Sequence, residues 1–211
     1  MRRTVLAVFL TLAAVLPTTP SGAAPGQVYH ERFHGSFASA GWFRSSARFS
    51  TDTFIDVTET KQQGQELFLL QFIEYFDASG DFTGATTIYA YATSGFVFEI
   101  DSARFSGAST SGSNLPAKRC SYDENFRVIG CTRVTFGVEV TWTGHGPIGR
   151  VKFHDHTEDG GIKYRFRWMG HQREANARAT SKGLEPFGKF ESASMGKASS
   201  GSVTVCTGSR C

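Results

Sequence analysis

The 211-residue sequence lacks the local motifs that most often mark a catalytic or redox site. No C-x-x-C pair is present, which argues against a thiol–disulfide exchange role. No G-x-S-x-G segment is present either, so the nucleophile elbow of a serine hydrolase is missing. A fixed internal repeat and a convincing amphipathic helix pattern are also absent, which excludes a propeller, a solenoid and a helical bundle.

The sequence has no apolar run long enough to span a bilayer as a helix. The apolar run from Val5 to Leu16 follows two arginines at positions 2 and 3 and precedes small residues that end near Ala23. This order is typical of a secretory signal peptide, although a twin-arginine signal is an alternative for the paired arginines. We predict removal of residues 1–23, a single domain over residues 24–211 with no transmembrane segment, and a secreted location, either extracellular or associated with the cell envelope.

Cysteine is scarce but even in number, as expected for disulfides in an oxidising compartment. Four cysteines allow three pairings. We favour Cys120 with Cys131, because the flanking segments can form a hairpin around residues 125–126 in which these two cysteines face each other. Cys206 would then pair with Cys211 and clip the C-terminus.

Net charge is small, at +3, but it is unevenly distributed. Residues 25–144 hold nine Lys and Arg against thirteen Asp and Glu, a net charge of −4. Residues 145–211 hold eleven against six, a net charge of +5. The C-terminal third therefore carries the positive field of the chain.

Short runs with a period of two, separated by Gly, Ser, Asn and Asp, predict an all-β fold. Small residues recur along several of these runs, which suits tightly curved strands. We therefore predict an antiparallel β-barrel, with a β-sandwich as the alternative. The run over residues 66–76 is apolar on both faces and predicts a central strand covered on both sides. The other clear runs are residues 32–43, 53–58, 86–93, 96–101 and 132–142.

The segment from Arg150 to Trp168 is the clearest β-hairpin, because two alternating runs flank Asp159-Gly160. With those two residues as the loop, Glu158 faces Gly161. The remaining predicted pairs are His156 with Lys163, Asp155 with Tyr164, His154 with Arg165, Phe153 with Phe166, Lys152 with Arg167, and Val151 with Trp168.

This alternation separates an apolar face from a cationic face. Burial of the apolar side chains is worth roughly 1.5–3 kcal/mol each, whereas a like-charge pair across two exposed strands costs at most about 1 kcal/mol. The hairpin therefore tolerates its cations. The apolar face holds Val151, Phe153, Tyr164, Phe166 and Trp168, and the cationic face holds Lys152, His154, His156, Lys163, Arg165 and Arg167.

The cationic face is either an ordinary polar surface or a site for phosphate and carboxylate groups. His154 and His156 share this face at a spacing that can hold a metal, but the neighbouring cations repel one, so we expect neither a metal nor a cofactor. Nucleic acid is not expected, because the aromatic side chains lie on the opposite face. The candidate anion-binding residues are Arg150, Lys152, His154, Lys163, Arg165 and Arg167.

The segment T-W-T-G-H-G-P at residues 141–147, which leads into the hairpin, resembles a turn in secreted actinobacterial proteins of uncharacterised function. The resemblance covers about a third of the chain. Because that group has no known activity, the resemblance implies an exported protein and supplies no catalytic residues.

Together these patterns predict a secreted, non-catalytic binding or structural module of the cell envelope or extracellular space. Its cationic hairpin would contact anionic polymers or lipids. The alternatives are a barrel that binds a small apolar ligand and a secreted hydrolase. The sequence leaves the oligomeric state and the identity of any ligand open.

Overall fold

The structure, a computed structural model, describes residues 28–159 and 162–207 and contains only strands, turns and irregular segments there. The predicted signal peptide lies outside these residues. The ten strands are β1 (Val28–Ser45), β2 (Phe49–Thr60), β3 (Gly64–Phe76), β4 (Phe82–Ala92), β5 (Phe96–Ile100), β6 (Gly107–Tyr122), β7 (Val128–Gly144), β8 (Gly149–Asp159), β9 (Ile162–Lys182) and β10 (Lys189–Thr207).

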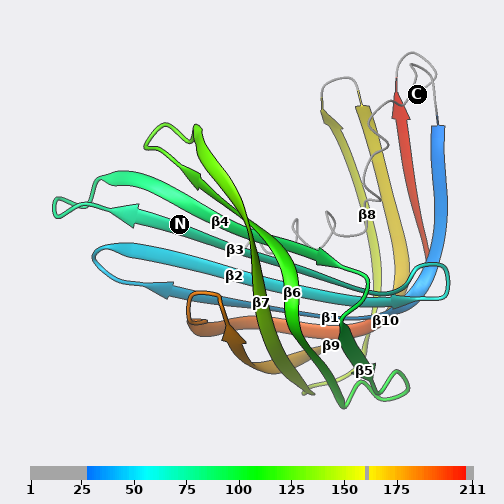
Figure 1. The fold of residues 1–211 in the computed structure, drawn as a ribbon. Coiled ribbons are helices and arrows are strands. Elements are labelled where there is room, and N and C mark those ends of the chain that lie inside the picture. Colours follow the sequence, from blue (N-terminus) through cyan, green and yellow to red (C-terminus); the bar gives the residue numbers. More distant parts are fainter. Residues whose placement is uncertain (1–27, 160–161, 208–211) are drawn as a thin grey trace.

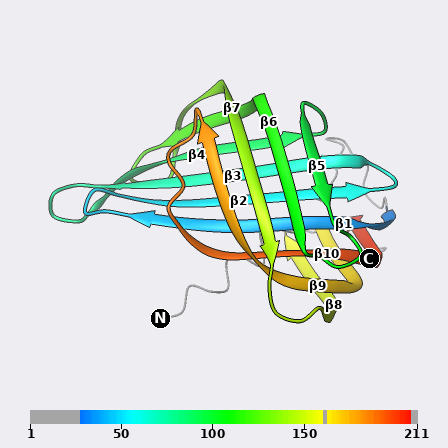
Figure 2. The ribbon, with the colours of Figure 1, turned by 90° about the horizontal axis from the view of Figure 1, so that it is seen from below.

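All ten strands belong to one antiparallel sheet, in the order β10-β1-β2-β3-β4-β6-β7-β9-β8. β10 also pairs with β9, so eight strands form a closed ring, while β5 adds to β6 and β8 adds to β9. Figures 1 and 2 show β6 and β7 crossing β1, β2 and β3 at a steep angle. The predicted antiparallel all-β fold is confirmed, and the strands form one sheet rather than two.

The interior of the ring is filled by its own side chains. Alanines from β1, β4 and β9 allow strands to approach closely, and large residues occupy the remaining space. Trp142 of β7 reaches across the ring, where its indole N–H donates to the carbonyl oxygen of Ser39 in β1 at 3.0 Å. Other fully buried side chains of the ring include Phe136, Ile55, Leu67, Leu69, Leu115 and Met195.

Residues 183–188 pack across one end of the ring. The Phe187 ring stacks on Trp42 with centroids 5.0 Å apart. Gln71, which is fully buried, donates to the carbonyl oxygen of Glu185 and accepts the Glu185 N–H. Elsewhere, the guanidinium of Arg173 donates to the backbone carbonyl oxygens of Gly146 and Arg104. Side chains therefore form hydrogen bonds with backbone groups that have no partner in the β-ladders.

The predicted runs match strands, although residues 86–93 and 96–101 each extend one residue past the end of β4 and β5. Several strands are longer than the runs. β9 contains 21 residues, because the second half of the hairpin and the segment after it form one continuous strand, and β10 contains 19 residues. β3 is central, as predicted, and its inner face is buried. On its outer face Phe68 and Phe72 are only half-buried, because the ring encloses the inner face of the sheet. The strand is therefore not fully covered on both sides, contrary to the prediction.

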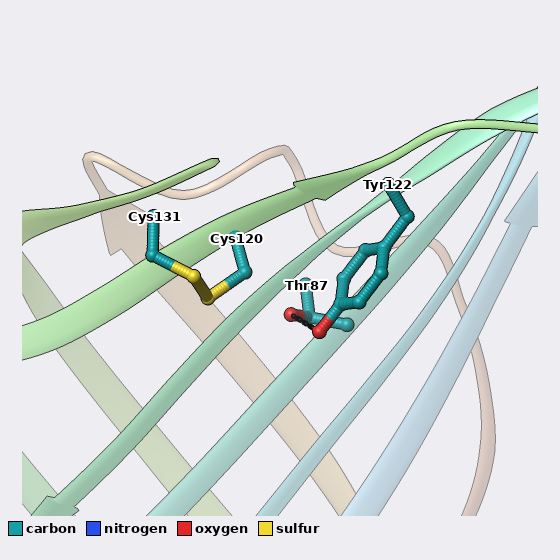
Figure 3. The surroundings of a disulfide bond; sticks show 4 residues. All are labelled: Thr87, Cys120, Tyr122 and Cys131. Carbon is teal, nitrogen blue, oxygen red and sulfur yellow. Dashed lines mark hydrogen bonds between the residues drawn. A yellow bond between two sulfur atoms is a disulfide. The ribbon is translucent and has the colours of Figure 1, made fainter. Parts of the chain in front are cut away.

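The predicted disulfide between Cys120 and Cys131 is present (Figure 3). The two cysteines are directly opposite in the β6–β7 hairpin. The hairpin closes around Asp123, whose carboxylate accepts the N–H groups of Asn125 and Arg127. Beside it, the hydroxyls of Thr87 and Tyr122 lie 3.3 Å apart and link β4 to β6. Cys206 lies one residue before the end of β10, but its predicted partner Cys211 lies outside the described residues, so this second pairing stays a prediction.

In the part of the chain that the structure describes, no helix is long and apolar enough to cross a membrane.

We predict that the double variant Cys120→Ser/Cys131→Ser is less stable than the wild type by about 2–3 kcal/mol, the chain-entropy value for a loop of this size. The sequence separation of the two cysteines is 11 residues. Urea unfolding measures the loss. A variant that unfolds at the wild-type midpoint would show that the hairpin needs no covalent link.

Candidate functional site

Four strand segments leave the ring together and form an arm, visible at the right of Figure 1. The arm consists of residues 28–33 of β1, all of β8, residues 162–170 of β9 and residues 200–207 of β10. In the sheet these segments lie in the order β8-β9-β10-β1. β2 pairs with β1 only from Gly35 onward, so both outer strands of the arm are free of ring neighbours.

The arm leaves the ring where the strands are irregular. The register shifts between Phe33 and Gly35 in β1 and between Ala198 and Ser200 in β10, at the same level of the sheet. Gly170 of β9 pairs with Ala198 there, and a Cβ on Gly170 would overlap the carbonyl oxygen of Lys197. Bulges increase strand bend, and glycine permits the close backbone approach, so these residues set the direction of the arm.

The two faces of the arm separate as the alternation predicts. Val151, Phe153, Phe166 and Trp168 are half-buried on one face. The Trp168 ring makes an edge-to-face contact with Phe37 at 5.5 Å, which joins this apolar face to the outer surface of the ring. On the other face, Arg150, Lys152, His154, His156, Arg165 and Arg167 are exposed and Lys163 is half-buried.

The predicted register of the hairpin is wrong by two residues. The last pair before the turn is Asp159 with Ile162, so Asp159-Gly160 is not the two-residue loop. A shift of two residues keeps every side chain on its face, so the apolar pattern alone could not distinguish the two registers. The observed pairs include Glu158 with Lys163, His156 with Arg165, His154 with Arg167, Phe153 with Trp168, Lys152 with Met169 and Arg150 with His171.

Electrostatics favours the observed register. The predicted register places Lys152 opposite Arg167, a like-charge pair that is unfavourable across strands. In the structure Lys152 is opposite Met169, and Lys163 is opposite Glu158. Glu158 therefore lies on the same face as the cations, opposite Lys163, the cation nearest the turn.

The sheet adds residues to this face that the sequence did not associate with the hairpin. Arg32 of β1 lies in the same row as Ser202, Arg167 and His154, and Lys197 of β10 lies in the row of His171 and Arg150. Both are exposed. Arg32 lies 118 residues before Arg150 and Lys197 lies 29 residues after Trp168, so no local pattern could have linked them to the hairpin. From here on, the cationic face is the side of the sheet that carries ten basic residues: Arg32, Arg150, Lys152, His154, His156, Lys163, Arg165, Arg167, His171 and Lys197.

A buried carboxyl group in the ring was also missed. Asp56 of β2 is 4% exposed and lies opposite Phe68 of β3. Burial, and then the nearby negative charge of Glu66, raise the pKa of Asp56 to about 7. The Tyr91 hydroxyl donates to the Glu66 carboxylate. In the sequence Asp56 alternates with apolar residues, which is typical of a solvent-facing position, so its burial could not be expected.

In the described residues, no three His, Cys, Asp or Glu side chains are grouped as they would be to hold a metal ion. The cationic face instead presents hydrogen-bond donors with permanent positive charge, the chemistry that recognises phosphate, sulfate and carboxylate groups.

Comparisons with protein families, with curated proteins and with solved structures found no match to this chain.

The raised pKa of Asp56 predicts that stability falls as the pH rises. The folded protein binds this proton more tightly than the unfolded chain, whose ordinary value is 3.8. The stabilising effect is therefore complete below about pH 4 and is lost as the pH rises through about 7, a loss of about 4 kcal/mol. The Asp56→Asn variant removes this dependence and should be more stable than the wild type at pH 8 but not at pH 4. Identical pH profiles of the unfolding midpoint for the two proteins would contradict the prediction.

Proposed function

We propose that the protein is a secreted, non-catalytic binding module of the cell envelope or extracellular space, and that it contacts an anionic partner through the cationic face of the arm. The observation that carries this proposal is the grouping of seven Lys and Arg side chains on one face of a projecting sheet. These residues are Arg32, Arg150, Lys152, Lys163, Arg165, Arg167 and Lys197.

The charge of this face is largely unbalanced. Among the described side chains of the cationic face on β8 and β9, Glu158 is the single carboxylate. The ladder places no two Lys or Arg side chains directly opposite each other, and in four of the five β8–β9 pairs on this face the cation has no carboxylate opposite it. An anionic partner supplies the missing negative charge.

The arm also suits a binding role by its position. Its cations lie on strands rather than on loops, so the ladder holds their spacing without a ligand. Asp155, also on β8, lies on the opposite face, where its carboxylate accepts the N–H of His156. The disulfide between Cys120 and Cys131 and the signal-like N-terminal sequence support export from the cell.

We predict that the purified protein binds envelopes of the cells that produce it, and that binding weakens steeply with salt. Between 0.01 and 0.15 M salt the screening length falls from about 30 Å to about 8 Å. The triple variant Lys152→Glu/Arg165→Glu/Arg167→Glu should lose binding. Lys152, Arg165 and Arg167 are exposed and lie opposite Met169, His156 and His154, respectively. The substitutions therefore place no two like charges directly opposite each other. Cosedimentation across a salt series measures the effect.

The matched control is Lys118→Glu/Arg119→Glu/Arg133→Glu, which changes the net charge by the same amount at three exposed positions of the β6–β7 hairpin. This control should bind as the wild type does. If both variants lose envelope binding equally, binding depends on net charge and not on the cationic face. A wild-type protein that stays in solution even at low salt would refute the proposed function.

A further inference from the structure

The cationic face has a linear order that the hairpin sequence alone does not reveal. Five successive levels of the β8–β9 ladder lie on this face, and each level contains one Lys or Arg. From the turn toward the ring, the levels are Glu158/Lys163, His156/Arg165, His154/Arg167, Lys152/Met169 and Arg150/His171.

The permanent cations therefore form a single line. Lys163, Arg165 and Arg167 follow one another along β9, and the line then crosses to Lys152 and Arg150 on β8. Successive levels are two residues apart, which is roughly 6.7 Å along a strand, so the five levels extend over about 27 Å. The crossing from β9 to β8 adds a sideways step of about 4.8 Å, the distance between neighbouring strands.

Beside the second, third and fourth levels, β10 presents hydroxyl groups, and beside the fifth level it presents Lys197. Ser200, Ser202 and Thr204 of β10 lie opposite Met169, Arg167 and Arg165, respectively. Hydroxyl groups can donate hydrogen bonds to the oxygen atoms of a charged group held by the neighbouring guanidinium. The line of cations is thus bordered on one side by β10 and on the other by the free edge of β8.

We propose that the cationic face binds a linear polyanion lengthwise over β8 and β9, with one charged group at each of the five levels. The ligand class is a flexible phosphodiester polymer whose charges are separated by short uncharged linkers. This inference rests on the proposed function and specifies its ligand.

The arrangement favours a linear polymer over a lipid bilayer. A membrane-surface site combines cations with apolar side chains that enter the bilayer from the same face. Here the aromatic side chains lie on the opposite face of the arm, and Met169 is the single large apolar side chain described on the cationic face of β8 and β9. On β8 and β9 the cations form a line, and Arg32 on β1 and Lys197 on β10 lie to one side of it.

The distance between successive levels determines which polymer is a suitable probe for the binding experiment. In a poly(glycerol phosphate) chain, three carbon and two oxygen atoms separate neighbouring phosphorus atoms, so successive phosphates can follow levels about 6.7 Å apart. In inorganic polyphosphate a single oxygen joins the phosphorus atoms, and the charges are too close together to match the levels one for one.

The test uses glycerol phosphate oligomers of one to eight repeats, titrated against the whole purified protein by calorimetry at several salt concentrations. The affinity and its salt dependence should rise with each repeat up to five and then level off, because each phosphate held by a cation adds to the salt dependence. Inorganic polyphosphate should show no break at five phosphates. This length series needs no variant, so it does not depend on how a substitution folds.

A composition-preserving swap tests the line itself. The variant Arg165→Thr/Thr204→Arg keeps the net charge and moves one cation from β9 to the opposite position on β10. It should bind the five-repeat oligomer roughly tenfold more weakly, the effect of one lost charge-assisted contact, and should bind single glycerol phosphate as the wild type does. Near-ultraviolet circular dichroism of the swap variant checks its fold.

The outcomes separate this inference from the proposed function. If oligomers bind but affinity rises without a break, or if the swap binds them as tightly as the wild type, the ordered line is refuted and general anion binding stands. If the protein binds vesicles that contain phosphatidylglycerol more tightly than the oligomers, at equal phosphate concentration, the ligand is a lipid surface and the polymer is refuted. If no anion binds even at low salt, the proposed function itself is refuted.

Discussion

The sheet closes on itself because β10 pairs along both of its edges. β10 hydrogen-bonds to β1 on one side and to β9 on the other, so the first and last strands of the described chain meet and the ring has no open seam. The same strand continues past the irregularity between Ala198 and Ser200 and joins the strands of the arm. Ring and arm therefore share their hydrogen-bonding partner, and the arm cannot separate from the ring without opening it.

The arm has one apolar face, which is partly buried, and one cationic face, which is solvated. Phe153, Phe166 and Trp168 are half-buried on one face, so each gains a part of the roughly 1.5–3 kcal/mol that full burial is worth. The cations on the other face repel one another more weakly than this, because they remain solvated. The apolar face therefore holds the strands in place, and the cationic face is free to carry more positive charge than stability alone would favour. A surface of this kind is suited to binding, since its charge is arranged before any partner arrives.

Part of the candidate site could be predicted from local pattern. Alternation assigned all six proposed anion-binding residues to one face, because a period of two is a property of any strand. The hairpin register was missed, because the predicted and observed pairings differ by two residues and expose the same faces. Arg32 and Lys197 could not be found, because their proximity to the hairpin depends on pairing between segments far apart in the chain. The burial of Asp56 was hidden for a related reason, since alternation describes which way a side chain points and not what covers it.

Local sequence pattern was enough to predict the all-β class, most strand positions, the two faces of the hairpin and the disulfide between Cys120 and Cys131. These features depend on short-range geometry: strand alternation, and a hairpin that brings two cysteines opposite each other. Local pattern did not predict the closure of the ring, the length of β9 and β10, the direction of the arm or the line of five cations. Those features depend on which strands pair and in which register, and pairing between distant strands is selected by the packing of the whole sheet.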